Sequence, residues 1–263
     1  MHFRSINFFS KEFFVNFLII LLPFSFIAGN LSINLNVIIL IFITLFFFRK
    51  NLFQLKFNFT DKLIFYFFAY LILVSTLSTI YKYNFENLND STTLIKSWAF
   101  LRFLLLYLTL RLLITFKIIN LRIFFVSCSA ATLFICLDLI FQFIFGYNFF
   151  GYVSIYPRHT TGMFGDEAIA GSFLQRFSLF CLFLIPLLIN EKIKSRILII
   201  VLFSLIFFSI GIAGNRMPLI LFLLTIFLTF FLIKDLRKYL LLLIVLVSLV
   251  FTILYNLNSN LKT

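Results

Sequence analysis

The sequence predicts an all-α polytopic membrane protein, and three observations support that class. Hydrophobic residues make up 63% of the 263 residues and charged residues 12%, whereas a soluble domain has about 45–50% and about 25%. Apolar runs of roughly 16–20 residues recur along the chain, as crossing a bilayer requires. These runs lack the alternation of short barrel strands, and only helices or closed barrels satisfy the backbone within lipid.

Nine apolar runs predict nine transmembrane helices. Their approximate ranges are 13–28, 33–48, 63–80, 98–116, 123–145, 169–189, 197–213, 218–233 and 239–255. The first follows Arg4 and Lys11 and is expected to be a retained anchor, because no small-x-small cleavage site follows it. The eighth begins with Pro218, which a first helical turn tolerates because its missing N–H would have no partner there. We expect a single transmembrane domain over residues 1–263.

The basic residues predict the orientation of these helices. One set of connections holds 14 Lys and Arg residues, namely Arg4, Lys11, Arg49, Lys50, Lys56, Lys62, Lys117, Arg122, Lys192, Lys194, Arg196, Lys234, Arg237 and Lys238. The alternate set holds five, namely Lys82, Lys96, Arg158, Arg216 and Lys262. By the positive-inside rule the first set is cytoplasmic, so the N-terminus lies in the cytoplasm and, after nine spans, the C-terminus lies on the outer side of the membrane. Topology thus explains most of the net charge of +13, and nucleic acid is not expected as a partner.

Four arginines lie on the side where positive charge is disfavoured. Arg102 is about one turn inside the outer end of the fourth run, and Arg176 is one to two turns inside that of the sixth. Arg158 lies in the long outer connection over residues 146–168, and Arg216 lies in the tight turn before the eighth run. An arginine in or near a membrane usually has a partner, so these positions require an explanation other than topology.

Acidic and amide residues occur at the same depth. Asp138 and Gln142 share a helical face at i, i+4, and Asp166 and Glu167 precede the sixth run. One interpretation is structural, with Asp138 paired to Arg102 or Arg176. The other is an outward-facing anion site, in which several guanidinium groups bind a diphosphate through paired hydrogen bonds. The carboxylates are too few to neutralise all four arginines, which favours the anion site.

The remaining reactive residue types do not indicate a catalytic or metal site. Cys128, Cys136 and Cys181 all lie inside apolar runs without a CxxC motif or a Cys/His cluster, so no metal, cofactor or disulfide framework is predicted. His159 is more typical of a loop residue than of a catalyst. The 43 phenylalanines are interpreted as lipid-facing or packing residues.

These polar motifs resemble, in their order and topology, the central signature of the O-antigen ligase and O-antigen polymerase superfamily. The core of the resemblance is Arg158, then Thr161-Gly162-Met163-Phe164-Gly165-Asp166-Glu167, then Gly171-Ser172 opening a long apolar helix. Upstream it includes Asp138, Gln142, Gly146 and Tyr147, and downstream Gly214-Asn215-Arg216-Met217. The resemblance extends roughly from Arg102 to Leu223.

The resemblance implies a bacterial inner-membrane glycosyltransferase of polysaccharide biosynthesis that needs neither cofactor nor metal. Its donor would be a glycan on a polyprenyl diphosphate such as undecaprenyl diphosphate. The acceptor would be another lipid-linked glycan in a polymerase, or the lipid A-core of lipopolysaccharide in a ligase. The periplasmic arginines would bind the diphosphate while an acceptor hydroxyl attacks the anomeric carbon. Arg216 is the best match to such an arginine, followed by Arg158, Arg176 and Arg102.

Two departures from the family pattern qualify this expectation. Gly165-Asp166-Glu167 replaces an amide-containing version, which favours a polymerase-like subgroup. Family members also continue past the ninth span into a large periplasmic loop and further spans, so we expect this sequence to correspond to the first two-thirds of a member.

Two other functions remain open at this stage. The chain is either a transporter or flippase for an anionic lipid-linked substrate, or a purely structural membrane subunit. A transporter requires polar residues through the inner half of the bundle as well, whereas the unexplained arginines lie only on the outer side. The distribution of charge therefore favours a transferase.

Overall fold

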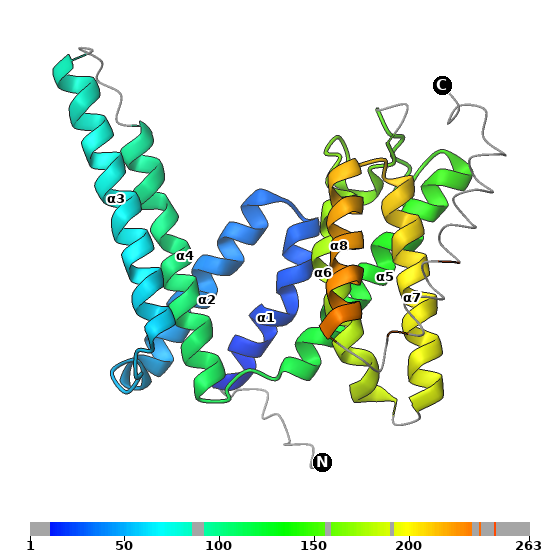
Figure 1. The fold of residues 1–263 in the computed structure, drawn as a ribbon, viewed down its shortest axis with the longest axis horizontal. Helices are drawn as coiled ribbons and strands as arrows, with labels where there is room; N and C mark the ends of the chain where they lie inside the picture. The colour runs from blue at the N-terminus through cyan, green and yellow to red at the C-terminus, as the bar shows by residue number, and fades with distance from the viewer. Residues whose placement is uncertain are drawn as a thin grey trace. The chain divides into compact units, whose positions relative to one another are not determined.

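The computed structural model describes residues 11–85, 92–155, 159–189 and 192–232, together with Arg237 and Val245. Eight α-helices form its framework: α1 (Lys11–Ile27), α2 (Asn30–Leu52), α3 (Phe59–Phe85), α4 (Thr92–Thr115), α5 (Leu121–Phe145), α6 (Ala170–Leu188), α7 (Lys192–Ile212) and α8 (Arg216–Leu232). A 3-10 turn, η1 (Gly162–Phe164), lies between α5 and α6. Because the described residues contain no strand, the all-α class is confirmed. Each of the first eight predicted spans coincides with a helix (Figure 1), and the ninth, at 239–255, lies outside the described residues.

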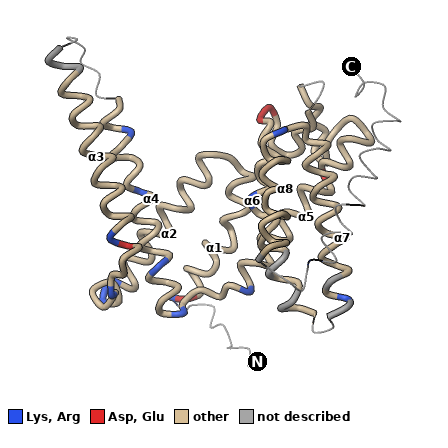
Figure 2. Tube along the Cα trace, in the orientation of Figure 1, with Lys and Arg blue, Asp and Glu red and all other residues tan. Residues whose placement is uncertain are grey.

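Four of these helices are long and apolar enough to cross a membrane. They are α2, the Phe59–Tyr81 part of α3, α4 and α5. Shorter apolar helices cover Ile197–Ile212 and Arg216–Phe231. Figure 2 shows long uncharged lengths of helix, with Lys, Arg, Asp and Glu gathered mainly near helix ends. Large apolar side chains such as Tyr66 and Phe46 are exposed on the helix surfaces, as expected of a protein whose solvent is lipid.

The chain divides into two compact units, which are described separately. Unit 1 comprises residues 1–22 and 31–120, and unit 2 comprises residues 23–30 and 121–263. In unit 1, α3 and α4 form an antiparallel pair (Figure 1).

Two amide side chains join helices and a connection of unit 1. In α1, Asn16 donates from Nδ2 to the carbonyl of Ile118 over 3.0 Å and accepts at Oδ1 from the amide of Asn120 over 2.7 Å. These two bonds satisfy backbone groups beyond the end of α4, where a helix supplies no partner. Asn36 of α2 donates to the carbonyl of Leu18, inside α1, over 3.2 Å and so joins α2 to α1.

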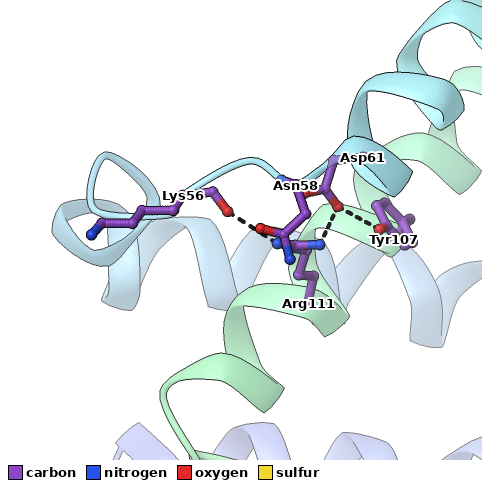
Figure 3. A network of polar contacts seen from close by, with 5 residues as sticks. All are labelled: Lys56, Asn58, Asp61, Tyr107 and Arg111. Atoms are coloured by element: carbon purple, nitrogen blue, oxygen red, sulfur yellow. Dashed lines mark hydrogen bonds and ion pairs between the residues drawn. The ribbon is translucent and has the colours of Figure 1, made fainter.

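A charged network holds the base of the α3–α4 pair (Figure 3). Asp61, in the first turn of α3, is fully buried and forms an ion pair with Arg111 of α4. It also accepts from the hydroxyl of Tyr107 over 2.6 Å and from the amide of Asn58 over 2.6 Å. The other nitrogen of the Arg111 fork donates to the carbonyl of Lys56 over 3.0 Å. Arg111, which the sequence analysis did not single out, therefore fixes the start of α3 against α4.

Unit 2 is a bundle of α5, α6, α7 and α8. Its largest fully buried side chains are Ile135, Leu139, Leu174, Phe203, Ile206, Ile210, Phe222 and Ile226. The rings of Phe203 and Phe222 stack with centroids 5.5 Å apart and join α7 to α8. Since lipid removes the hydrophobic drive between membrane helices, this close van der Waals packing is what holds the bundle together.

The ion pair of unit 1 gives a stability prediction. Replacing Arg111→Gln leaves the buried carboxylate of Asp61 without its counter-ion, so the temperature of thermal unfolding in detergent micelles falls. Asp61→Asn lowers this temperature as well. The double variant lowers it by less than the sum of the two single changes, because both changes break the same interaction. The exposed Arg122→Gln is the control and leaves the unfolding temperature unchanged. Additive losses would show that the two residues act independently.

Candidate functional site

The connection between α5 and α6 is held by a buried asparagine that the sequence analysis did not single out. Asn148 is fully buried. Its side-chain oxygen accepts from the amides of Phe150 over 3.0 Å and Tyr152 over 2.8 Å. Its Nδ2 donates to the carbonyl of Gly162 over 2.8 Å. One side chain therefore closes a tight turn and ties it to η1, fourteen residues later.

Asp138 and Gln142, placed on one face of α5 by their spacing, bind the same connection. The carboxylate of Asp138 accepts at Oδ1 from the amide of Phe149 over 2.9 Å. Gln142 accepts at Oε1 from the amide of Gly162 over 2.7 Å and directs Nε2 to the carbonyl of Tyr152 at 3.4 Å. Both side chains are buried. They anchor the backbone of this connection to the C-terminal part of α5.

The second oxygen of Asp138 explains why η1 begins with glycine. Oδ2 faces the backbone of Gly162 and Met163 without reaching hydrogen-bond geometry. Gly162 has φ +57°, and a Cβ there would lie 2.9 Å from this oxygen and 3.2 Å from Cδ2 of Leu139. Since neither oxygen of Asp138 faces Arg176, the Arg176–Asp138 pair considered from the sequence is not formed.

The far part of the connection is tied to the turn between α7 and α8. The hydroxyl of Thr160 donates to the carbonyl of Ile212 over 3.0 Å, and the ring of His159 lies 3.2 Å from the carbonyl oxygen of Ala213. Asn215 donates to the carbonyl of Ala168. His159 thus has a structural role in the loop, and the beginning of α6 lies beside the beginning of α8.

The predicted arginines divide into three groups. Arg176 on α6 and Arg216 at the first position of α8 are exposed, and neither makes an ion pair or hydrogen bond with another described residue. Arg102 belongs to α4 of unit 1, where its guanidinium lies 5.0 Å from the ring centroid of Phe103, so the structure does not place it with the others. Arg158 lies outside the described residues.

The acidic pair lies at this same end of unit 2. Asp166 and Glu167 are exposed and directly precede Ala168, whose carbonyl is bound by Asn215. Arg216 follows Asn215 directly in the chain. The carboxylates of Asp166 and Glu167 and the guanidinium of Arg216 therefore lie close to the starts of α6 and α8. This end of unit 2 therefore combines a backbone fixed by buried side chains with charged groups that remain accessible to a ligand.

The chemistry of this end is binding and orientation. Within the described ranges, no group of three or more His, Cys, Asp or Glu residues lies close enough to hold a metal ion. The helix start of α6 points backbone N–H groups toward the same region, which favours anions, and the arginine forks suit phosphate oxygens. Phosphate is therefore the ligand chemistry that these groups fit best.

Comparison with known proteins adds no further identification. No protein-family description, curated protein or solved structure matches the chain.

The close approach at Gly162 gives a second prediction. Gly162→Ala places a methyl group against Asp138 and Leu139 at a positive φ, so it costs about 1–2 kcal/mol of backbone strain and about 1–3 kcal/mol more for the overlap. Gly151→Ala is the matched control, because Gly151 has φ +81° in the same loop and nothing lies within 4 Å of its added Cβ. The free energy of unfolding of each variant is measured in detergent, and the loss is expected to be larger for Gly162→Ala. An equal loss of stability at both positions would rule out the contact with Asp138.

Proposed function

We propose that the chain is a membrane glycosyltransferase of the polymerase or ligase type. It transfers a glycan from a polyprenyl diphosphate to a glycan or lipid acceptor on the periplasmic side of a bacterial inner membrane. The observation that supports this most directly is the pair of exposed guanidinium groups, Arg176 and Arg216, beside a connection that buried side chains hold in place. Among the described residues no carboxylate forms an ion pair with either guanidinium group, so both are accessible to an anionic ligand.

The proposed reaction needs little from the protein beyond binding. The acceptor hydroxyl forms a bond to the anomeric carbon, the bond from that carbon to the diphosphate oxygen breaks, and the hydroxyl proton is released to water. A diphosphate is a good leaving group when cations stabilise the charge that develops on it. Arg216 and Arg176 are assigned this role, whereas the predictions for Arg158 and Arg102 rest on the sequence alone. No catalytic base is assigned.

The distribution of charge in unit 2 supports a transferase over a transporter. Beyond the first five residues of each helix, α5, α6, α7 and α8 contain two charged residues, Asp138 and Arg176. Both lie in the half of their helix nearer to residues 146–169, which connect α5 to α6 and are here called the clamped connection. A translocation path for an anion would require charged groups in the opposite half as well, whereas the buried polar groups there in α5 are the neutral hydroxyls of Ser127, Ser129 and Thr132. Chemistry at one surface therefore fits the pattern better than transport.

We further propose nine spans with a cytoplasmic N-terminus. The alternation of basic residues, 14 against five over successive connections, supports this orientation. It places the clamped connection, the start of α6 and the start of α8 together on the periplasmic side.

Arg216 provides the functional test. In cells whose own gene is deleted, Arg216→Ala lowers the amount of polymerised or ligated surface glycan by roughly 10–100-fold, the effect of losing a hydrogen bond to a charged group. Arg216→Lys retains part of the activity because it keeps the charge but loses the fork. Gel electrophoresis of surface polysaccharide gives the readout. Arg122→Ala, an exposed arginine in the first turn of α5, is the matched control. An unchanged glycan profile with abundant Arg216→Ala protein would refute the transferase.

The orientation has a separate test. In a background where Cys128, Cys136 and Cys181 are replaced by Ala, Glu167→Cys reacts with a membrane-impermeant maleimide in spheroplasts. Gln54→Cys, at the exposed α2–α3 turn, reacts only after the membrane is permeabilised. The opposite pattern would reverse the proposed topology without affecting the fold.

A further inference from the structure

Residues 147–155, here called the aromatic loop, are apolar and exposed although they do not belong to a helix. The exposed side chains are Tyr147, Phe149, Phe150, Tyr152, Val153 and Ile155. Phe150 is 62%, Val153 70% and Ile155 67% exposed. No charged residue occurs from 139 to 155, and the two strongly polar side chains of that stretch, Gln142 and Asn148, are buried. A loop in water normally has the opposite composition.

The backbone amides in the middle of this loop, from residue 148 to residue 152, are satisfied from within the protein. The amide of Asn148 donates to the carbonyl of Tyr152, and that of Gly151 to the carbonyl of Asn148, each over 2.9 Å. The amide of Phe149 donates to Asp138, and the amides of Phe150 and Tyr152 donate to the Asn148 side chain. Every amide from 148 to 152 therefore has an intramolecular acceptor. Water could serve these amides in an ordinary surface loop, whereas lipid cannot.

The aromatic loop is continuous with the lipid-accessible surface of α5. The ring of Phe149 lies 4.8 Å from that of Phe141 and 6.1 Å from that of Phe134, measured between centroids. Tyr147 contacts Phe141 edge-on at 5.6 Å. Phe143, Ile144 and Phe145 in the last turn of α5 are exposed as well. One apolar surface thus runs from the end of a membrane-crossing helix onto the loop.

We propose that the aromatic loop is embedded in the interfacial region of the lipid bilayer and anchors this end of unit 2 there. Exposed apolar side chains and the internally satisfied amides of residues 148–152 both suit a lipid environment, which offers few hydrogen-bond partners to irregular backbone. Tyrosine and other aromatic rings also favour the headgroup region of a bilayer. This inference requires only that the chain spans a membrane and is independent of glycan transfer.

A carbohydrate platform explains these residues less well. Aromatic rings that stack on sugars need no aliphatic neighbours, whereas Val153 and Ile155 are among the most exposed apolar side chains of the loop. An aqueous platform would also leave no reason for the side chains of Asp138 and Asn148 to serve the amides of the loop. Lipid accounts for both features.

Fluorescence quenching tests the proposal. The single tryptophan, Trp98, is changed to Phe, and Val153→Trp is then introduced into protein reconstituted in phosphatidylcholine vesicles. Lipids brominated near the headgroup quench this tryptophan, and aqueous acrylamide does not. Ile144→Trp on the exposed face of α5 is the control for lipid, and Glu167→Trp in the same α5–α6 connection is the control for water. Circular dichroism confirms that each variant keeps its helical content.

The possible outcomes discriminate between the occupants of this surface. Quenching of Val153→Trp by brominated lipid to the extent seen for Ile144→Trp supports the anchor. Quenching by acrylamide alone, as for Glu167→Trp, places the loop in water and overturns it. Resistance to both quenchers shows that a protein surface or a second copy covers the loop, and it overturns the proposal equally. Since no glycan is present, these results do not depend on the proposed enzymatic activity.

Discussion

The organisation of unit 2 depends on one constraint, which is that buried backbone groups must find their hydrogen-bond partners within the protein. Three buried side chains meet that constraint where α5 ends. Asp138, Gln142 and Asn148 accept from or donate to the backbone of residues 149–162. The connection is therefore fixed to α5, and through Thr160 to the α7–α8 turn. The candidate site owes its rigidity to these bonds, because each of its charged groups lies next to a segment that they hold.

The sequence predicts the helices well and their contacts poorly. An apolar run of membrane length specifies a helix by itself, so eight predicted runs coincide with eight helices. The predictions were short where polar residues continue a helix beyond the apolar run, as at Thr92–Lys96 in α4. The partner of Asp61 was not predicted, because it lies 50 residues away and depends on how α3 packs against α4.

The candidate site shows the same division between position and role. Topology and spacing place Asp138, Gln142, Asp166 and Arg216 at one end of the chain's second half, and the structure brings these residues to one end of unit 2. What Asp138 does was not predictable, since its role depends on the φ/ψ path of a loop that only later returns to α5. Asn148 was overlooked for the same reason. Its one sequence signal is an asparagine directly after a Gly–Tyr pair at a helix end, a position that favours turns.

An interfacial aromatic loop also gives a physical reason for the unusual position of Arg176. A guanidinium one to two turns from the start of α6 is costly at full membrane depth, but its long side chain reaches the headgroup layer when the helix start is held near that layer. The clamped connection joins the aromatic loop to the start of α6 through Asn148 and Gly162. Anchoring the loop in the interface would therefore set the depth of Arg176 and Arg216 together. That depth is where the diphosphate of a lipid-linked substrate lies, so the proposed anchor and the proposed anion site place the same requirement on the fold.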